Sequence, residues 1–127
     1  MRALLDTSFF VATESGRQLA DATDVTETEV SVVTLAELTV GVLTADDSVR
    51  PDRLATLALV ESTWDALPVD VAVSRAFARI VADLRAQGRR VPILDALVAA
   101  TAVVNEIPVV TQDRDYESIP GLQVIRV

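Results

Sequence analysis

Short apolar runs alternate with longer stretches of helical periodicity along this chain. Runs rich in β-branched and aliphatic residues predict short strands at residues 3–6, 30–34, 66–69 and 109–111, and an edge strand at 123–127. Apolar positions spaced three and four apart predict helices at residues 7–22 (broken around Gly16), 35–43, 51–63, 71–87 and 92–105. Strands separated by helices indicate an α/β fold with a short, mainly parallel sheet flanked by helices on both faces. In such folds the ligand lies beyond the carboxyl ends of the strands.

The composition removes most of the usual enzyme chemistry. The 127 residues fit one domain, residues 1–127, and half of them are hydrophobic, so a core is available. The chain contains no Cys and no His, and all eleven basic residues are arginines. Imidazole, thiolate and Schiff-base mechanisms are therefore excluded, as is a P-loop. Carboxylates, hydroxyls and guanidinium groups remain, and an enzyme built from these favours a hard divalent cation bound by oxygen.

Hydropathy and charge bear on location and partners. The longest apolar stretch, residues 96–104, is far shorter than the roughly 20 residues that a membrane-spanning helix needs. With no membrane segment and no possible disulfide, we expect a soluble cytoplasmic protein. The formal net charge of −8 argues against a general electrostatic grip on nucleic acid and suits a basic protein partner.

One predicted helix carries most of the positive charge. On a helical wheel the segment 71–87 places its apolar residues on one side and its arginines on the other. Extended past the helix, the wheel keeps five arginines within a sector of roughly 140°: Arg75, Arg79, Arg85, Arg89 and Arg90. Two interpretations stay open, a solvated face and a stripe that contacts the phosphates of RNA.

Four acids occupy positions where a core favours apolar residues. Asp6 ends the first strand, Asp113 follows the strand at 109–111, Glu37 lies at the start of a predicted helix, and Asp95 lies in an apolar helix. Each has a local explanation as a capping or turn residue; Glu37, for example, forms a capping-box pattern with Thr34.

Capping does not explain why all four acids fall at one end of the predicted sheet. Two follow strands and two lie in the opening turns of helices, so all are expected to face the same edge. Carboxylates gathered there repel one another unless a cation neutralises them, and the chain has no Lys or His to do so. Mg²⁺ or Mn²⁺ is the cation that this reasoning predicts.

Several motifs, in this order and spacing, carry a family resemblance. They are Leu5-Asp6-Thr7-Ser8, the segment 31–38 with Gly41, the segment 93–102, the segment 110–116 ending in Tyr116, and the closing segment 120–124. On these the chain resembles the PIN-domain ribonucleases, and specifically the VapC-like toxins of type II toxin-antitoxin systems, over essentially its whole length. The resemblance implies a single PIN-like domain.

The resemblance also implies roles for individual residues. Asp6, Glu37, Asp95 and Asp113 match the catalytic acids that bind the metal. Thr7, Ser8 and Thr111 match hydroxyl positions that line the site and hold an acid or a water molecule. Asp115 matches a less regular position, where an acid beside the site and a plain turn residue are both possible; we favour the turn residue.

The expected function is that of a toxin acting as a divalent-metal-dependent endoribonuclease. Metal-activated water attacks the phosphodiester, and products ending in 5′-phosphate and 3′-hydroxyl follow because the 2′-hydroxyl route usually needs imidazole. The resemblance implies inhibition by a cognate VapB-like antitoxin in a hetero-oligomer, and a homodimer for which segments 35–43 and 51–63 are the candidates.

Two other functions stay open at this point. One is a catalytically silent PIN-like module that binds a protein partner. The other is a receiver-type domain in which Asp6 or Asp113 accepts a phosphoryl group, which the absence of lysine disfavours.

Overall fold

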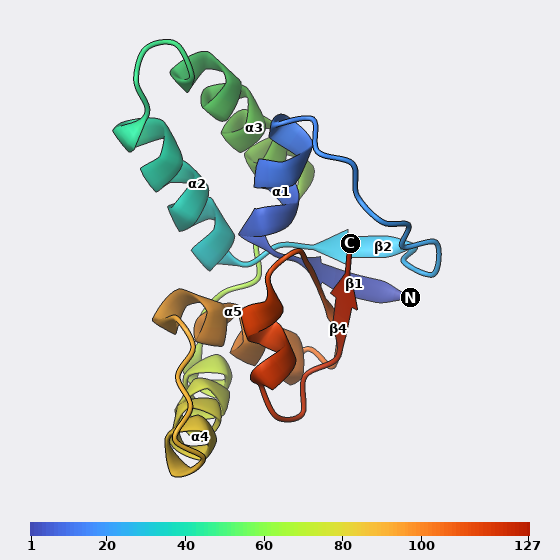
Figure 1. Ribbon diagram of the computed structural model, residues 1–127, viewed down its shortest axis with the longest axis vertical. Helices are drawn as coiled ribbons and strands as arrows, with labels where there is room; N and C mark the ends of the chain where they lie inside the picture. Colours follow the sequence, from blue (N-terminus) through green and yellow to red (C-terminus); the bar gives the residue numbers. More distant parts are fainter.

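A four-stranded parallel sheet forms the centre of the computed structural model, which describes residues 1–127 (Figure 1). The strands are β1 (Arg2–Leu5), β2 (Glu27–Glu29), β3 (Val109–Thr111) and β4 (Val124–Arg126), in the spatial order β2-β1-β3-β4. All three neighbouring pairs are parallel, as the alternation of strands and helices predicts. Strand β4 lies at an edge of the sheet, which confirms the prediction for the last residues of the chain.

Five α-helices and one short 3₁₀ helix connect the strands. They are α1 (Thr7–Glu14), α2 (Val32–Thr44), α3 (Arg50–Thr63), α4 (Val71–Ala86), α5 (Ile93–Val104) and the 3₁₀ helix η1 (Arg114–Ser118). No helix has both the length and the apolar character needed to span a membrane.

Alternate residues of the strands pack into two separate hydrophobic cores, one on each face of the sheet. Leu4 of β1 and Val109 of β3 face one side, where they join buried residues of α4 and α5. Ala3, Leu5 and Val110 face the other side, with buried residues of α1 and α3. This period-two alternation explains why both faces of a short sheet are covered (Figure 1).

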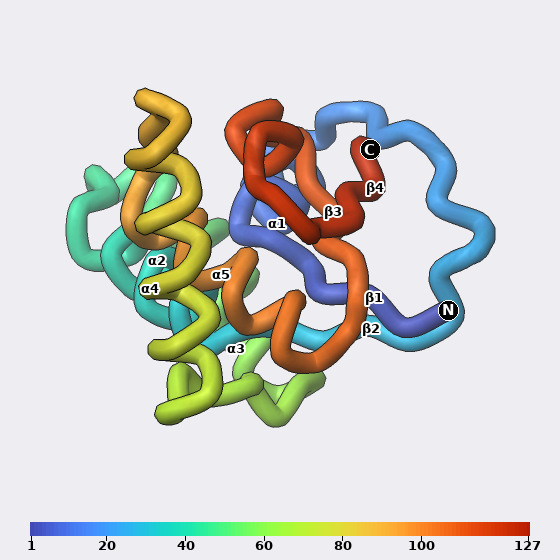
Figure 2. Tube along the Cα trace, turned by 90° about the horizontal axis from the view of Figure 1, so that it is seen from below, coloured from blue at the N-terminus to red at the C-terminus, as the bar shows by residue number.

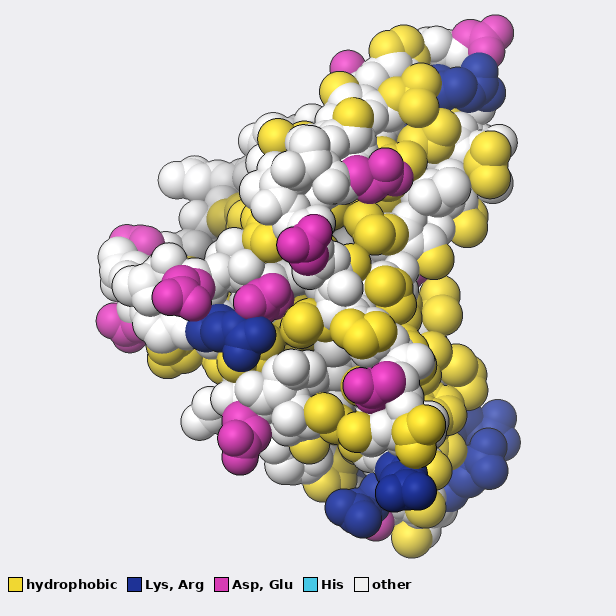
Figure 3. Space-filling model, turned by 180° about the vertical axis from the view of Figure 1, so that it is seen from behind, with side chains coloured by type: hydrophobic (Ala, Val, Ile, Leu, Met, Phe, Trp, Pro, Cys, Tyr) yellow, Lys and Arg dark blue, Asp and Glu magenta, His cyan; other side chains and the backbone are white.

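Helices α2 and α3 pack against each other and form an arm that extends away from the sheet (Figure 1). The arm leaves large apolar side chains on its surface, and Figure 3 shows apolar atoms exposed along it. The most exposed are Leu43 at 75% and Leu59 at 61%. The homodimer predicted through these two segments stays a prediction.

The predicted strand at residues 30–34 is wrong. Strand β2 ends at Glu29, and α2 begins at Val32 because the Ser31 side chain accepts a hydrogen bond from the backbone N–H of Val33 at 3.0 Å. A good N-cap therefore overrides the β propensity of the valines that follow it. The capping box of Thr34 is wrong for the same reason, since that residue already lies inside the helix.

Two smaller expectations also fail. Helix α1 ends at Glu14, and Gly16 follows with a positive φ of 71°, a left-handed conformation typical of helix ends. Residues beyond it run as a long link around the edge of the sheet to β2 (Figure 2). The expected strand at 66–69 is reduced to one isolated bridge between Ser31 and Leu67.

Candidate metal centre

The carboxyl ends of β1 and β3 lie side by side, with Leu5 opposite Val110 in the parallel register. The residue after β1 is Asp6, which is only 3% exposed and caps α1. The last residue of β3 is Thr111, whose Oγ1 donates a hydrogen bond to Asp6 Oδ2 at 3.0 Å. The parallel pairing of β1 and β3 thus places the buried Asp6 carboxylate next to Thr111, one of its hydrogen-bond donors.

The second oxygen of Asp6 is held by Tyr116 of η1. The Tyr116 hydroxyl donates to Asp6 Oδ1 at 2.8 Å and lies 3.4 Å from Asp95 Oδ1. Tyr116 is completely buried, and burial followed by the charge of Asp6 raises the pKa of its hydroxyl above the ordinary value. The tyrosine therefore stays a neutral donor between two acids.

Glu37 reaches the same region from the interior of α2. Its Oε1 accepts a hydrogen bond from Thr7 Oγ1 at 2.8 Å, and Thr7 also contacts Thr34 at 3.3 Å. Partial burial raises the pKa of Glu37; the hydrogen bond from Thr7 opposes this effect, and the charge of Asp6 adds to it.

Asp95 and Asp113 meet with a third acid, Asp115. Each of the three offers a carboxylate oxygen, and these oxygens all lie within 4.8 Å of one another. Burial, followed by the negative charge of Asp6, Asp113, Glu37 and Asp115, raises the pKa of Asp95 to about 7. The raised pKa of Asp95 thus reflects the proximity of all four other acids. We call these five residues, Asp6, Glu37, Asp95, Asp113 and Asp115, the acid cluster.

No cation of the protein offsets this charge. The three salt bridges join Arg2 to Glu29, Arg50 to Asp47 and Arg126 to Glu117, and none involves the acid cluster. Carboxylate oxygens with hydroxyl groups around them are the donor set that hard divalent cations prefer. The residues present therefore fit Mg²⁺ or Mn²⁺, and they lack the nitrogen and sulfur ligands typical of zinc.

The structure brings the four predicted acids into one place, together with the three predicted hydroxyl residues. Ser8 Oγ lies 3.0 Å from Thr111 Oγ1 and accepts a hydrogen bond from the backbone N–H of Gln112. Asp115 donates its backbone N–H to Asp113 Oδ1 at 2.9 Å, so it shapes the turn, yet its carboxylate also belongs to the acid cluster. The geometry of Asp115 thus fits both alternatives, a turn residue and an acid beside the site.

Tyr116 is the site residue that sequence reasoning missed. The sequence identified it as an aromatic residue but not as a hydrogen-bond donor to the acids. The local sequence offers little signal, since Tyr116 is flanked by charged residues, Asp115 and Glu117, and nothing in this polar segment predicts a buried tyrosine.

Comparison with known proteins places the chain in a family. The family model described as PIN domain matches residues 3–122. The chain belongs to the PIN-domain family. This PIN domain is similar to Ribonuclease VapC5 of Mycobacterium tuberculosis, with 47% identity over 98% of this chain and 94% of that protein. It is also similar to Ribonuclease VapC4 of the same species, with 45% identity over 99% of this chain and 97% of that protein.

Solved structures agree with this assignment. The crystal structure of VapBC-5, a member of the VapBC family of toxin-antitoxin systems from Mycobacterium tuberculosis, superimposes on this PIN domain with a TM-score of 0.89. The two share 42% identity over 99% of this chain and 98% of that one. The fold and the order of its elements are therefore those of the VapC proteins.

The predicted arginine stripe is divided in this PIN domain. All five arginines are exposed. Arg75 and Arg79 lie along α4, and Arg85 lies near its end, whereas Arg89 and Arg90 lie beyond it in the link to α5. Helix α4 ends at Ala86, before the wheel reaches the last two arginines, so they share no helical face with the others.

Proposed function

We propose that this PIN domain is an endoribonuclease of the VapC type, the toxin of a toxin-antitoxin pair. The observation that carries the proposal is the acid cluster at the carboxyl ends of β1 and β3, in a chain 47% identical to a protein named Ribonuclease VapC5. A cognate antitoxin of the VapB type is the proposed inhibitor, because the similar crystal structure is that of a VapBC system.

The proposed cofactor is Mg²⁺ or Mn²⁺, held by the carboxylates of Asp6, Glu37, Asp95 and Asp113. A bound divalent cation supplies Lewis-acid chemistry, lowering the pKa of a water molecule and stabilising charge on the phosphate. Support comes from the donor set and from the absence of any salt bridge to these acids. Asp115 is placed by this proposal at the margin of the same site.

The other side chains of the site hold the acids in position. Thr111 and Tyr116 fix the two oxygens of Asp6, and Thr7 fixes Glu37. Because Asp6 and Glu37 are held by neutral hydroxyls and not by cations, their charge stays available for a ligand. The chain contains no imidazole to activate a 2′-hydroxyl, so we expect hydrolysis to leave 5′-phosphate and 3′-hydroxyl ends.

Incubation of the purified chain with a mixed RNA pool, with and without Mg²⁺ or Mn²⁺, tests the proposal. We expect cleavage that depends on the added metal and stops in EDTA, with product ends that accept a 3′ adaptor directly. Cyclic phosphate ends contradict the hydrolytic route. The absence of cleavage at every metal concentration favours the silent binding module instead.

A further inference from the structure

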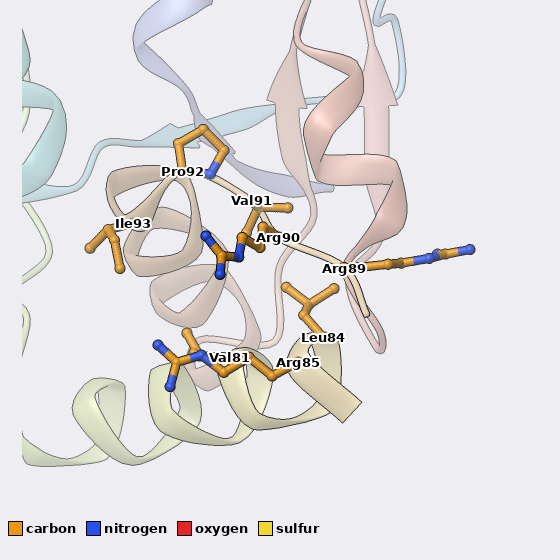
Figure 4. Close-up of a pocket in the computed structure, with 8 residues that line it drawn as sticks. All are labelled: Val81, Leu84, Arg85, Arg89, Arg90, Val91, Pro92 and Ile93. Carbon is orange, nitrogen blue, oxygen red and sulfur yellow. The ribbon is translucent and has the colours of Figure 1, made fainter. Parts of the chain in front are cut away.

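A second concentration of charge, of opposite sign to the acid cluster, lies beside the start of α5. A hollow of about 450 Å³ separates the last turns of α4 from the link that leads into α5 (Figure 4). Its volume is within the range of about 300–1,000 Å³ that is typical of small-ligand sites. Apolar side chains form part of its wall, among them Val81, Pro92 and Ile93, and three arginines line it: Arg85, Arg89 and Arg90. We call it the arginine hollow.

Two of the three arginines share the hollow. Figure 4 shows the side chains of Arg85 and Arg90 extending to the same side, toward Ile93, whereas Arg89 points away. Figure 3 shows arginine side chains gathered at the same end of the molecule, where α4 lies. Two guanidinium groups on one side of a hollow repel each other, and an anion between them relieves that repulsion.

These arginines have no partner inside the protein. Arg2, Arg50 and Arg126 form salt bridges, and Arg17 and Arg53 donate hydrogen bonds to Gln112 and to the carbonyl of Gly41. The arginines that make no side-chain hydrogen bond or salt bridge are Arg114 and the five of the predicted stripe. The charge of Arg85 and Arg90 is therefore fully available to a ligand.

The hollow and the acid cluster share the first turn of α5. Its wall includes Ile93, the first residue of α5, and Asp95 belongs to the same first turn of that helix. Residues two positions apart on a helix lie about 3 Å apart along its axis but point to opposite sides of it. An RNA strand whose scissile phosphate lies at the acid cluster reaches the hollow by crossing the first turn of α5 with a neighbouring nucleotide.

We propose that the arginine hollow binds one nucleotide of single-stranded RNA next to the scissile phosphate. Arg85 and Arg90 hold its phosphate, and its base packs on the apolar wall formed by Val81, Pro92 and Ile93. The proposal rests on the ribonuclease function proposed above and adds a substrate-binding site to it. Arginine suits this role because its planar guanidinium contacts phosphate with two hydrogen bonds and also stacks on bases.

A nucleotide uses both parts of the hollow. An acidic peptide segment supplies negative charge, but it matches the apolar wall only where an apolar side chain adjoins its carboxylates. A nucleotide supplies a phosphate for the guanidinium groups and a base for the wall, so single-stranded RNA fits the hollow better than an acidic segment of a protein.

Binding of a short, fluorescently labelled single-stranded RNA in EDTA tests the proposal, because the wild-type chain then binds without the metal needed for cleavage. We expect the double variant Arg85→Ala/Arg90→Ala to bind at least about tenfold more weakly, with a salt slope reduced by about 0.7, the change expected for the one phosphate that the two arginines no longer neutralise. The matched control is Arg75→Ala/Arg79→Ala, which removes the same amount of charge from α4, outside the hollow. Equally weakened binding in the two double variants overturns the proposal.

The apolar wall is tested separately with Ile93→Ala. We expect this variant to weaken RNA binding about threefold while the salt slope stays that of the wild type. A polyglutamate peptide with as many charges as the RNA represents the competing class of partner. We expect it to bind at least about tenfold more weakly than the RNA. Equally tight binding of the peptide overturns the nucleotide assignment.

The two proposals fail in different assays. If the wild-type chain cleaves RNA with Mg²⁺ and both double variants bind RNA alike, the arginine hollow is contradicted alone. If the wild-type chain cleaves no RNA with any metal while the two double variants differ as expected, the ribonuclease function is contradicted alone.

Discussion

The acid cluster and the arginine hollow lie near the same turn of α5, yet they hold their charges in opposite ways. The acids are fixed: Thr111 and Tyr116 hold Asp6, and Thr7 holds Glu37. Arg85 and Arg90 are exposed and have no partner that fixes them. Fixed geometry suits a small ion that needs defined ligand distances, whereas exposed, unpaired guanidinium groups suit a polymer whose phosphates vary in position.

This difference explains how an acidic protein is compatible with a polyanionic substrate. The net charge of −8 is an average over the whole chain. The two signs of charge are concentrated in different regions: the acid cluster suits a cation, and the unpaired arginines of the hollow suit an anion. The predictions below separate the two regions by changing one and measuring both.

Replacing the central acid is expected to have the largest effect. Asp6→Asn keeps the shape of the side chain and removes its charge, so cleavage at saturating Mg²⁺ should fall by about a thousandfold or more. RNA affinity in EDTA should not fall, because one negative charge has been removed. Rates of cleavage of a labelled RNA measure the effect, with the exposed Asp65→Asn as the matched control. Wild-type activity in Asp6→Asn excludes this acid from the site.

Removing the Tyr116 hydroxyl should have an intermediate effect. Tyr116→Phe leaves Asp6 without one of its donors, so we expect Mn²⁺ affinity to fall by about 10- to 100-fold in calorimetric titration. The free energy of unfolding should fall by about 1–3 kcal/mol, and RNA affinity in EDTA should not change.

The control for this change is Thr101→Val, which removes another buried hydroxyl, one that donates to the Leu97 carbonyl within α5. It should lower stability without changing Mn²⁺ affinity. Unchanged Mn²⁺ affinity in Tyr116→Phe, together with lower stability, shows that the tyrosine serves only the core.

The repulsion within the acid cluster should appear as a pH dependence of stability. The pKa of Asp95 is raised from 3.8 to about 7 in the folded protein, so the folded state binds this proton more tightly than the unfolded chain. Below the unfolded-state pKa of 3.8, this group makes its whole contribution to the free energy of unfolding. That contribution is lost as the pH rises through the folded-state pKa of about 7. In EDTA the melting temperature should therefore fall by several degrees across this range, and Asp95→Asn should flatten the curve. Mg²⁺ should raise the melting temperature most at the alkaline end.

The smallest expected effect concerns the link that carries Arg89 and Arg90. Gly88 has a positive φ of 67°, and a Cβ added there meets no atom within 4 Å, so Gly88→Ala costs only the backbone strain, about 1 kcal/mol. The melting temperature should fall by about 4 °C. Gly16→Ala, at φ 71°, should lower it equally. RNA affinity should fall only in Gly88→Ala; a fall in both variants contradicts a local role of the link.

Elements with strong local signals were predicted to within a residue or two. Strand β3 has the predicted bounds, and α4 ends just before Gly88, as the glycine indicates. The error at residues 30–34 has a physical origin, since valine and threonine favour strands on average, while a single serine cap decides where α2 begins.

The site was predictable where the positions of strands determine it. Asp6 and Asp113 follow β1 and β3, which are adjacent in a parallel sheet, so their convergence follows from topology alone. The contacts of Tyr116 and Asp115 depend instead on how η1 folds back after β3. No periodicity encodes the conformation of one turn of 3₁₀ helix, and these two residues were therefore missed or judged less important.

The position of the single tyrosine also has a spectroscopic consequence. The chain has one tyrosine and one tryptophan, and they lie in different cores: Tyr116 on the α4–α5 side of the sheet, Trp64 against Phe10 on the other. Each face of the sheet thus carries its own chromophore. A free tyrosine gains ultraviolet absorbance on ionising near pH ~10, whereas Tyr116 stays protonated there while the protein is folded. The appearance of tyrosinate absorbance in an alkaline titration therefore marks the opening of the core beneath the acids, and Trp64 fluorescence follows the opposite core separately.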